Sequence, residues 1–410
     1  MVTMNTSKAV IAIFTKLPPT FTLTVTVAGN GSGTTTSSPS GIDCGIDCTE
    51  IYSSGTIVAL TPTPAVGSVF TGWSGDADCG DGSVTLNASK TCTATFTLDG
   101  VLQNPLCPSA TTLEGLVQCI KGYIPLANSE GFVPPSPTVQ TDWRLMVGQM
   151  LAQGCPVTLP LSLQPLYAVG TFTDAENGQI YCVLLEIVDQ DNNHSVDAGW
   201  GTFIVNHQAS RELAIQIPHP LHDTNTPEQG IGIFKGVGAR SFLLSGTHRY
   251  TNSVASSCQP SYEEADAAHN VDNLFQAAVV ELMAFYDSTL VSFVALQFHG
   301  MGVTNCSGVD VYLTHGRTTT PQAGDAILQL QANLQQEPLT SSWVVVVPGD
   351  ALSCSLNGTD NVQGRLLNGV ASGDLCTVAA TGYTGRFIHI EQKFDFRNAA
   401  DWISAILATF

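Results

Sequence analysis

Histidine and acidic side chains are concentrated around one short stretch of a weakly charged chain. The segment LAIQIPHPLHDTNTPEQG (213–230) places His219 and His222 directly after an apolar run, and Glu228 at the start of a predicted helix. Only 12% of the residues are charged, so this grouping stands out from the rest of the chain. Two neutral imidazoles and a carboxylate form a common ligand set of catalytic zinc sites. The stretch therefore predicts a metal site.

Further polar residues stand at the ends of other apolar runs. His248 and Arg249 follow one run, His299 ends another, His315 follows a third and Glu391 lies near the end of a fourth. Ligands of open α/β sheets bind at the carboxyl ends of the strands. We therefore expect these side chains to meet His219 at one rim of a sheet.

Strand-like and helix-like segments alternate from residue 211 to 410, which predicts an α/β domain with a mainly parallel mixed sheet. The predicted strands are ELAIQIPH, ARSFLLSGTHR, SFVALQFHGM, VDVYLTHG, SWVVVVPGD and GRFIHIEQ. The predicted helices are TPEQGIGIFKGVG, EADAAHNVDNLFQAAVVELMAFYD, AGDAILQLQANLQQ and AADWISAILATF.

Asp266 and His269 form a second polar cluster at the start of the longest of these predicted helices. At a spacing of three residues they would share one helix face. They could orient the metal ligands or provide half of a second metal site. Alternatively, Asp266 could simply cap the helix.

Four phrases of the C-terminal half carry a family resemblance: IPHPLHDTNTPEQ, SGTHRYTN, ALQFHGM and FIHIEQ. In this order they resemble N-formylglutamate amidohydrolases and, more distantly, zinc carboxypeptidases. The resemblance spans residues 211–410 and implies a three-layer, phosphorylase/hydrolase-like α/β fold with one zinc ion. It also implies hydrolysis of an amide next to a carboxylate, in a small acyl-amino-acid or peptide-like substrate.

By position, the resemblance assigns the zinc ligands to His219, Glu228 and His299. The sequence departs from the carboxypeptidase spacing, because His222 stands where an acid is expected. Asp223 and His222 therefore remain alternative ligands. Other residues that could replace a ligand or orient one are His248, Asp266, His269 and His315.

The resemblance places a catalytic glutamate at Glu391. Its apolar neighbours should raise the pKa of this carboxyl group, which suits a general base. Arg249 is the expected clamp for a substrate carboxylate or an oxyanion. Arg317 and Arg386 are further candidates for substrate binding, although each could form a structural salt bridge instead.

An acidic loop between two predicted strands is a candidate calcium site. Asp189, Asp191, Asn193 and Asp197 alternate oxygen-bearing side chains, which can converge on one hard cation. The loop lacks the glycine and the distal glutamate of an EF-hand. An Asx-rich hairpin turn is the alternative.

The N-terminal quarter reads as a β-repeat. MNTSKAVIAIFTK (4–16) and LNASKTCTATFTL (86–98) share residues at an offset of 82, so residues 1–16 are expected to be the tail of a preceding repeat and 17–99 a complete module. GSGTTTSSPSGIDC, VFTGWSGDADC and CTATFTL resemble the bacterial extracellular repeats related to the internalin B-repeat. The expected disulfides are Cys44 with Cys48 and Cys79 with Cys92.

Residues 100–210 are expected to form a linker and a subdomain of helices and a β-hairpin. Helices are predicted in ATTLEGLVQCIKGYI and TDWRLMVGQMLAQG, the second capped by Thr141 or Asp142 and closed by Gly154. The hairpin is QIYCVLLEIVDQDNNHSVDAGWGTFIVN. Cys107 and Cys119 could tie the first helix to the linker.

The charge, the cysteine number and the apolar runs of the chain limit its possible partners and location. The 34 acidic and 14 basic residues give a formal charge of −20, which argues against nucleic acid as a partner. Twelve dispersed cysteines indicate an oxidising compartment, and no apolar run reaches the roughly 18 residues of a membrane span. No signal peptide is visible, yet an extracellular or bacterial cell-surface location fits best, with cell-wall or matrix contact through the β-repeats.

Three functions remain open on the sequence. A one-zinc amidohydrolase leads, and a two-metal phosphoesterase built from the additional histidines is the enzymatic alternative. The third is an adhesin whose C-terminal domain binds a ligand without catalysis.

Overall fold

The computed structural model describes residues 11–13, 16–29, 31–65, 68–336, 340, 342–352 and 354–410. The chain divides into two compact units, residues 1–99 and 100–410. The predicted tail of a preceding repeat, residues 1–16, lies for the most part outside the described residues. Among the described helices, none has the length and apolar character needed to cross a membrane.

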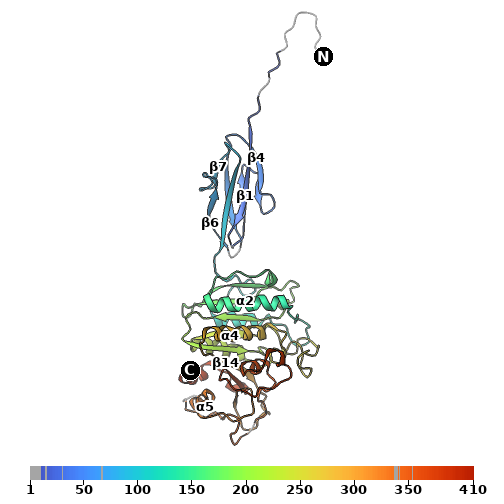
Figure 1. Ribbon diagram of the computed structural model, residues 1–410, viewed down its shortest axis with the longest axis vertical. Helices are drawn as coiled ribbons and strands as arrows, with labels where there is room; N and C mark the ends of the chain where they lie inside the picture. Colours follow the sequence, from blue (N-terminus) through green and yellow to red (C-terminus); the bar gives the residue numbers. More distant parts are fainter. Residues whose placement is uncertain are drawn as a thin grey trace, which may run out of the picture. The chain divides into compact units, whose positions relative to one another are not determined.

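The first unit is built from β-strands, as predicted. Two four-stranded sheets have the orders β4-β1-β8-β6 and β3-β2-β5-β7. Figure 1 labels β1, β4, β6 and β7 of this unit. Strands β1 and β8 are parallel, whereas the other pairs are antiparallel. The strands are β1(Thr20–Ala28), β2(Gly33–Ser38), β3(Asp43–Cys44), β4(Thr49–Ser53), β5(Ile57–Pro64), β6(Ser68–Gly75), β7(Ser83–Thr85) and β8(Lys90–Leu98).

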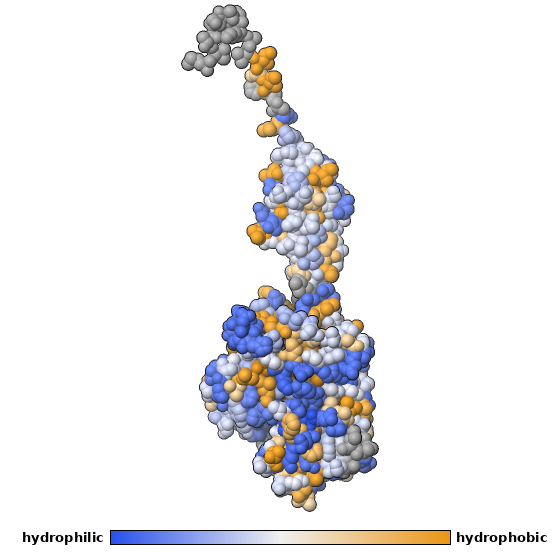
Figure 2. Space-filling view, turned by 180° about the vertical axis from the view of Figure 1, so that it is seen from behind, coloured by the Kyte–Doolittle hydropathy of each residue, from blue (hydrophilic) through white to orange (hydrophobic). Residues whose placement is uncertain are grey.

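A small core holds this module together. Alternation along β1 buries Leu23 and Val25 and leaves the intervening threonines more exposed, as expected for a half-buried strand. The predicted bridges Cys44–Cys48 and Cys79–Cys92 are both present. Figure 2 shows much of the visible surface of residues 16–99 in pale colours, which reflects its many threonine, serine and glycine residues.

The second unit is organised around one nine-stranded mixed sheet. Its order is β16-β15-β17-β14-β12-β13-β11-β10-β9. The strands are β9(Tyr167–Thr173), β10(Ile180–Glu186), β11(Thr202–Val205), β12(Arg211–Ile217), β13(Ala239–Leu244), β14(Val294–Gly300), β15(Val311–Thr314), β16(Val345–Val346) and β17(Phe387–Gln392).

Among the strands of residues 211–410, four of the five neighbouring pairs are parallel, as predicted for a mainly parallel mixed sheet. One sequence expectation is corrected: residues 100–210 are not a separate subdomain, because β9, β10 and β11 extend the same sheet from the outer edge of β13. They add three antiparallel pairs, so the whole sheet has four parallel and four antiparallel pairs. The hairpin strand β11 pairs with β13, so its apolar side chains share the core of the α/β unit.

Helices cover both faces of the sheet. Side chains of α2, α4 and α6 contribute to one hydrophobic core, and those of α1, α3, α5 and α7 contribute to the other. Figure 1 shows α2 and α4 side by side over the sheet. The helices are α1(Leu113–Lys121), α2(Pro137–Gln153), α3(Thr226–Gly236), α4(Leu274–Thr289), α5(Ala326–Gln336), α6(Val362–Leu367) and α7(Ala399–Thr409), with short 3₁₀ turns η1(Leu161–Leu163), η2(Ser372–Asp374) and η3(Phe394–Phe396).

Two helix starts differ from the prediction, each because another residue supplies the cap. Helix α2 begins at Pro137 after Ser136, whose side chain accepts the backbone N–H of Val139. Helix α4 begins only at Leu274, capped by Asn273. Asp266 and His269 therefore lie in the turns that precede α4, and Asp266 does not cap it.

The strand order creates a switch point in the middle of the sheet. Strand β12 is followed along the chain by β13 on one side and by β14 on the other, all parallel. Helix α3, which connects β12 to β13, packs on one face, whereas α4, which connects β13 to β14, packs on the other. The carboxyl ends of β12 and β14 therefore border a crevice, which is where α/β sheets bind ligands.

All twelve cysteines are paired. The four bridges of the second unit are Cys107–Cys119, Cys155–Cys182, Cys258–Cys376 and Cys306–Cys354. Cys258–Cys376 closes the longest loop, with a sequence separation of 118. It joins the turns before α4 to the segment after α6.

Removing the Cys258–Cys376 bridge should destabilise the second unit more than removing Cys107–Cys119, whose sequence separation is 12. Loop-closure entropy predicts losses of about 5 and about 3 kcal/mol for the two double Cys→Ser variants. Denaturant titration followed by the fluorescence of the buried Trp143 and Trp402 measures both. Equal losses would contradict the prediction.

Candidate metal centre

His219 and Asp223 meet because the chain turns sharply after β12. The backbone N–H of Asp223 donates to the carbonyl of His219 at 2.9 Å, which closes a single turn. This turn brings Asp223 Oδ2 to 3.1 Å from His219 Nδ1. Both side chains are buried, with exposed fractions of 3% or less.

His299 reaches the same carboxylate from the neighbouring strand. It lies near the end of β14, and its Nδ1 is 3.6 Å from Asp223 Oδ2. The ring centroids of His219 and His299 are 5.0 Å apart. The predicted convergence of these two histidines is thus present in the structure.

The electrostatics of this trio favour an ionised carboxylate at Asp223 and a neutral imidazole at His299. Burial by itself would raise the pKa of Asp223, but its interactions with His219 and His299 outweigh burial and hold this pKa well below its usual range. Burial lowers the pKa of His299 to about 4, against the opposing effect of Asp223. A neutral imidazole is the form that binds metals.

Asp266 holds the opposite side of His219. Its Oδ1 lies 3.0 Å from His219 Nε2 and 3.0 Å from His269 Nδ1, and its Oδ2 pairs with Arg249 at 2.5 Å. Burial would raise the pKa of Asp266, yet the two histidines lower it well below its usual value. Asp266 therefore orients His219 with its Nδ1 toward Asp223, as a carboxylate does behind a metal-bound histidine.

Glu391 lies beside His299 on the adjacent strand. The two residues are register partners of β14 and β17, and Glu391 Oε1 is 3.7 Å from His389 Nε2. Burial raises the pKa of Glu391 well above its usual value, and the charge of Asp223 adds to the effect. The expected raised pKa is thus present, with burial as its main cause.

The donor set fits a zinc ion. One nitrogen each from His219 and His299 and one oxygen from Asp223 lie within 4.8 Å of one another, in a buried group. Two histidines and one carboxylate are a known catalytic zinc set that leaves a fourth position for water.

Glu228 is not part of this centre, contrary to the sequence expectation. Its carboxylate pairs with Lys121 of α1 at 2.5 Å, and 38% of its side chain is exposed. Residues Asp223 to Asn225 form further turns before α3 begins, so Glu228 is carried to the outer side of the first helical turn. Asp223, which the sequence left as an alternative, occupies the position assigned to Glu228.

His315, Arg317 and Arg386 belong to the opposite rim. Strand β15 runs antiparallel to β17, so His315 follows β15 beside the start of β17, where its Nδ1 lies 3.1 Å from the carbonyl of Phe387. Arg386 precedes β17 and pairs with Asp287, while Arg317 donates to Thr319. The expectation of one rim assumed parallel strands, which fails at β15.

His222 and His248 form an aromatic cluster next to the centre. Their ring centroids are 5.5 Å apart, and the ring of Tyr250 packs on both. The centroid of His222 is 6.4 Å from that of His219. Neither residue belongs to a group of potential ligands among the described residues.

A cavity of about 370 Å³ opens over the centre. His219, His299, Arg249, His269 and Glu391 line it, so the structure brings together five residues proposed from the sequence. The remaining lining residues, which the sequence analysis missed, are Tyr262, His389 and the segment 355–361.

The segment 355–361 closes one side of this cavity. A Cβ at Gly358, whose φ is +63°, would lie 2.9 Å from the ring of His389. Asp360 accepts a hydrogen bond from Tyr262, whose ring stacks on His269 at 3.6 Å. The Asn-Gly-Thr-Asp-Asn composition is a visible signal of a turn, but not of a turn folded over the sheet.

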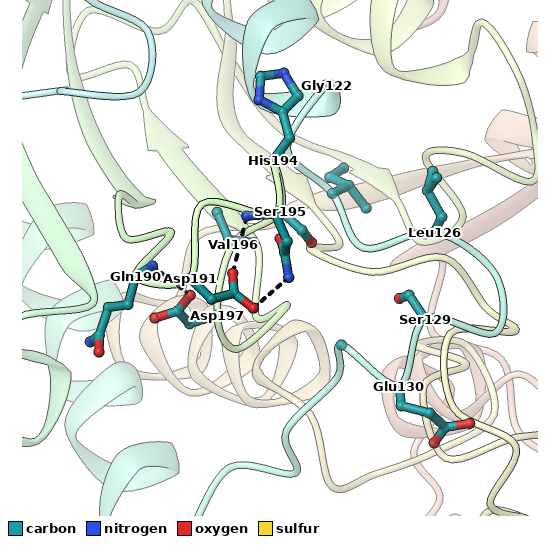
Figure 3. A pocket seen from close by; sticks show the side chains of 13 residues that line it. Gly122, Leu126, Ser129, Glu130, Gln190, Asp191, His194, Ser195, Val196 and Asp197 are labelled. Carbon is teal, nitrogen blue, oxygen red and sulfur yellow. Dashed lines mark hydrogen bonds between the residues drawn. The ribbon is translucent and has the colours of Figure 1, made fainter.

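The acidic loop lies at a second cavity of about 740 Å³ (Figure 3). Oxygens of Asp189, Asp191 and Asp197 lie within 4.8 Å of one another. They already accept backbone N–H groups of the same loop: Asp189 those of Asn193 and His194, and Asp197 that of Gln190. Asn193 also donates its side-chain amide to Asp191, so the loop has the hydrogen bonds of an Asx-rich turn. The calcium site stays a prediction.

In the comparison with known proteins, a family match covers most of the first unit. Residues 22–100 match the divergent InlB B-repeat domain family, as the sequence phrases indicated. No curated protein matches the sequence. A repeat module of this type, together with the six disulfides, fits an extracellular protein.

One similar solved structure is the crystal structure of gene product Atu2144 from Agrobacterium tumefaciens. The similarity has 11% sequence identity and a TM-score of 0.27, and covers 49% of this chain and 85% of the other. A TM-score this low does not establish a common fold. The architecture of the second unit, helices packed on a large mixed sheet, is therefore described from its own strand order.

The corrected ligand set predicts different metal affinities for two matched variants. Asp223→Asn removes a ligand charge and should lower zinc affinity at least about 100-fold, whereas Glu228→Gln should leave it unchanged. Competition titration with a chromophoric chelator measures both, and circular dichroism verifies folding. If only Glu228→Gln lost zinc, the result would support Glu228 as the ligand, as expected from the sequence, and contradict Asp223.

Proposed function

We propose that residues 100–410 form a zinc-dependent amidohydrolase, with a phosphorylase/hydrolase-like three-layer fold. Its substrate class is a small acyl-amino-acid or peptide-like amide near a carboxylate. One observation carries the proposal: His219, Asp223 and His299 converge at the crevice between β12 and β14, with Glu391 directly beside them.

The chemistry divides between the ion and the side chains. Zinc, when bound, lowers the pKa of a water molecule and polarises the carbonyl group of the amide. The side chains of His219, His299 and Asp223 would hold the ion, and Glu391 would accept the proton of the attacking water. Glu391 is buried and faces the same cavity, so that proton transfer is shielded from bulk water.

Arg249 supplies a positive charge on the wall of the cavity. One guanidinium nitrogen is engaged by Asp266, and Arg249 lines the cavity. We assign to its guanidinium the hydrogen bond that a substrate carboxylate or a developing oxyanion needs.

The B-repeat unit suits a carrier role. Among the described residues, every potential ligand of the centre lies between 219 and 391, in the second unit. A stalk of this kind would hold the enzyme near a cell wall or an extracellular matrix.

A two-metal phosphoesterase is the second candidate, favoured by two further groups of potential ligands, one of which is His299, His389 and Glu391. His219, Asp266 and His269 also lie within 4.8 Å of one another. The ion pair between Arg249 and Asp266 weighs against a cation there, since a fixed positive charge already occupies that carboxylate. Elemental analysis separates the candidates: one tightly bound zinc per chain supports the amidohydrolase, and two support the phosphoesterase.

Glu391→Gln tests the proposed mechanism. Turnover of a panel of N-acyl amino acids and carboxyl-terminal peptides should fall by about 10²- to 10⁴-fold, because the general base is lost, while zinc content stays unchanged. Glu228→Gln, a glutamate outside the centre, serves as the control. Wild-type turnover by Glu391→Gln would refute the role of this residue.

A further inference from the structure

We propose that Gln297 and Asn361 are positioning residues that determine which ring nitrogen of His299 carries the proton. They place the proton on Nε2 and leave the lone pair of Nδ1 directed at Asp223. The inference deepens the proposed function and rests on it for its metal-binding part, because Nδ1 is then free to bind a metal. The tautomer itself can be established whether or not zinc binds.

Asn361 has only one possible orientation. It precedes α6, and its side-chain Oδ1 accepts the backbone N–H of Gly364 at 2.7 Å. A backbone N–H can only donate, so the atom at this position must be the oxygen. The amide nitrogen of Asn361 therefore points the other way, and it lies 2.5 Å from Gln297.

Gln297 is oriented from two sides. The side-chain atom that faces the amide nitrogen of Asn361 must be an acceptor, which makes it Oε1. Independently, Gln363 donates its amide nitrogen to the backbone carbonyl of Ala267 at 2.8 Å, so Oε1 of Gln363 faces Gln297. Gln297 donates its Nε2 to that oxygen at 3.3 Å. Two backbone groups far apart in the sequence thus require the same orientation.

The orientation of Gln297 determines the tautomer of His299. Nε2 of His299 lies 2.8 Å from Gln297 Oε1, and an amide oxygen can only accept. His299 must therefore donate from Nε2. Its Nδ1 carries no proton in the neutral ring and faces Asp223 Oδ2 at 3.6 Å.

Burial fixes this arrangement of hydrogen bonds. Gln297, Gln363 and Asn361 are each at most 1% exposed, so water does not offer alternative partners. Gln297 uses both lone pairs and both amide hydrogens, donating its second hydrogen to Gln216 at 3.0 Å. Reversing the amide would place donors against donors and acceptors against acceptors, which is expensive in a buried site.

His219 is held in the same way by a different group. Its Nε2 faces Asp266, so its Nδ1 is the nitrogen near Asp223. Both histidines would thus bind a metal through Nδ1, with Nε2 hydrogen-bonded behind. Loss of such a supporting hydrogen bond typically lowers metal affinity about 10- to 100-fold.

Nitrogen-15 NMR of the chelator-treated protein tests the tautomer directly. The imidazole signals missing from His299→Ala identify His299 in the wild-type spectrum. We expect the long-range couplings and chemical shifts of an Nε2–H tautomer at pH 8. An Nδ1–H tautomer would overturn the inference.

Gln297→Met and Gln216→Met form a matched pair of variants. Both remove a fully buried amide of the same network, but only Gln297 contacts His299. Gln297→Met should abolish the single-tautomer signal of His299 and weaken zinc binding by about 10- to 100-fold, whereas Gln216→Met should preserve both. An unchanged tautomer in folded Gln297→Met, or equal effects of the two variants, would contradict the inference.

The two proposals fail in different ways. A wild-type Nε2–H tautomer without zinc binding would refute the proposed zinc enzyme and leave the positioning role intact. Zinc binding by a protein in which His299 is the Nδ1–H tautomer would support the zinc site and refute the positioning role. If Gln297→Met does not fold, the wild-type spectrum still decides the question.

Discussion

A buried carboxylate shared by two imidazoles is the constraint on which this molecule depends. Asp223 lies between His219 and His299 at the middle of the sheet, where none of the three is appreciably solvated. An unpartnered charge there would be strongly destabilising, so each group must have its partners supplied by the fold. Asp266 behind His219 and Gln297 behind His299 meet this requirement.

The sheet topology explains why these partners converge. Along the chain, β12 is followed by β13 on one side and then by β14 on the other, which opens a crevice at the carboxyl ends of β12 and β14. Strand β17 adds Glu391 next to His299. The antiparallel strand β15 ends at the other rim and carries His315 away. The direction of a strand therefore decides which polar residues join the centre.

Much of the fold was predictable because local patterns dictate it. The alternation in β1, the apolar runs of β12, β14 and β17, and the periodicity of α3 and α7 each indicated the correct element. The B-repeat phrases and two of its bridges were likewise readable. The extension of the sheet beyond β13 by β9, β10 and β11 was not predictable. The pairing of β11 with β13, a strand distant in the sequence, leaves no local signal.

The candidate centre was predicted in outline and corrected in detail. His219, His299, Arg249 and Glu391 stand at strand ends, and that position alone indicated a common site. Glu228 was the wrong acid, since an extra turn before α3 separates it from His219, and only the turn at Asp223 shows which carboxylate faces the crevice.

By itself, the sequence determined which residues could do chemistry and at which strand ends they stand, because residue type and hydrophobic period are local properties. The tertiary structure alone decided which carboxylate lies between the two histidines, which histidines lie at the far rim, and how Asn361 orients Gln297. Several of these contacts join residues far apart in the sequence, such as Asn361 with Gln297, 64 positions apart, and Gln363 with Ala267, 96 positions apart. Their geometry follows from strand direction and side-chain packing.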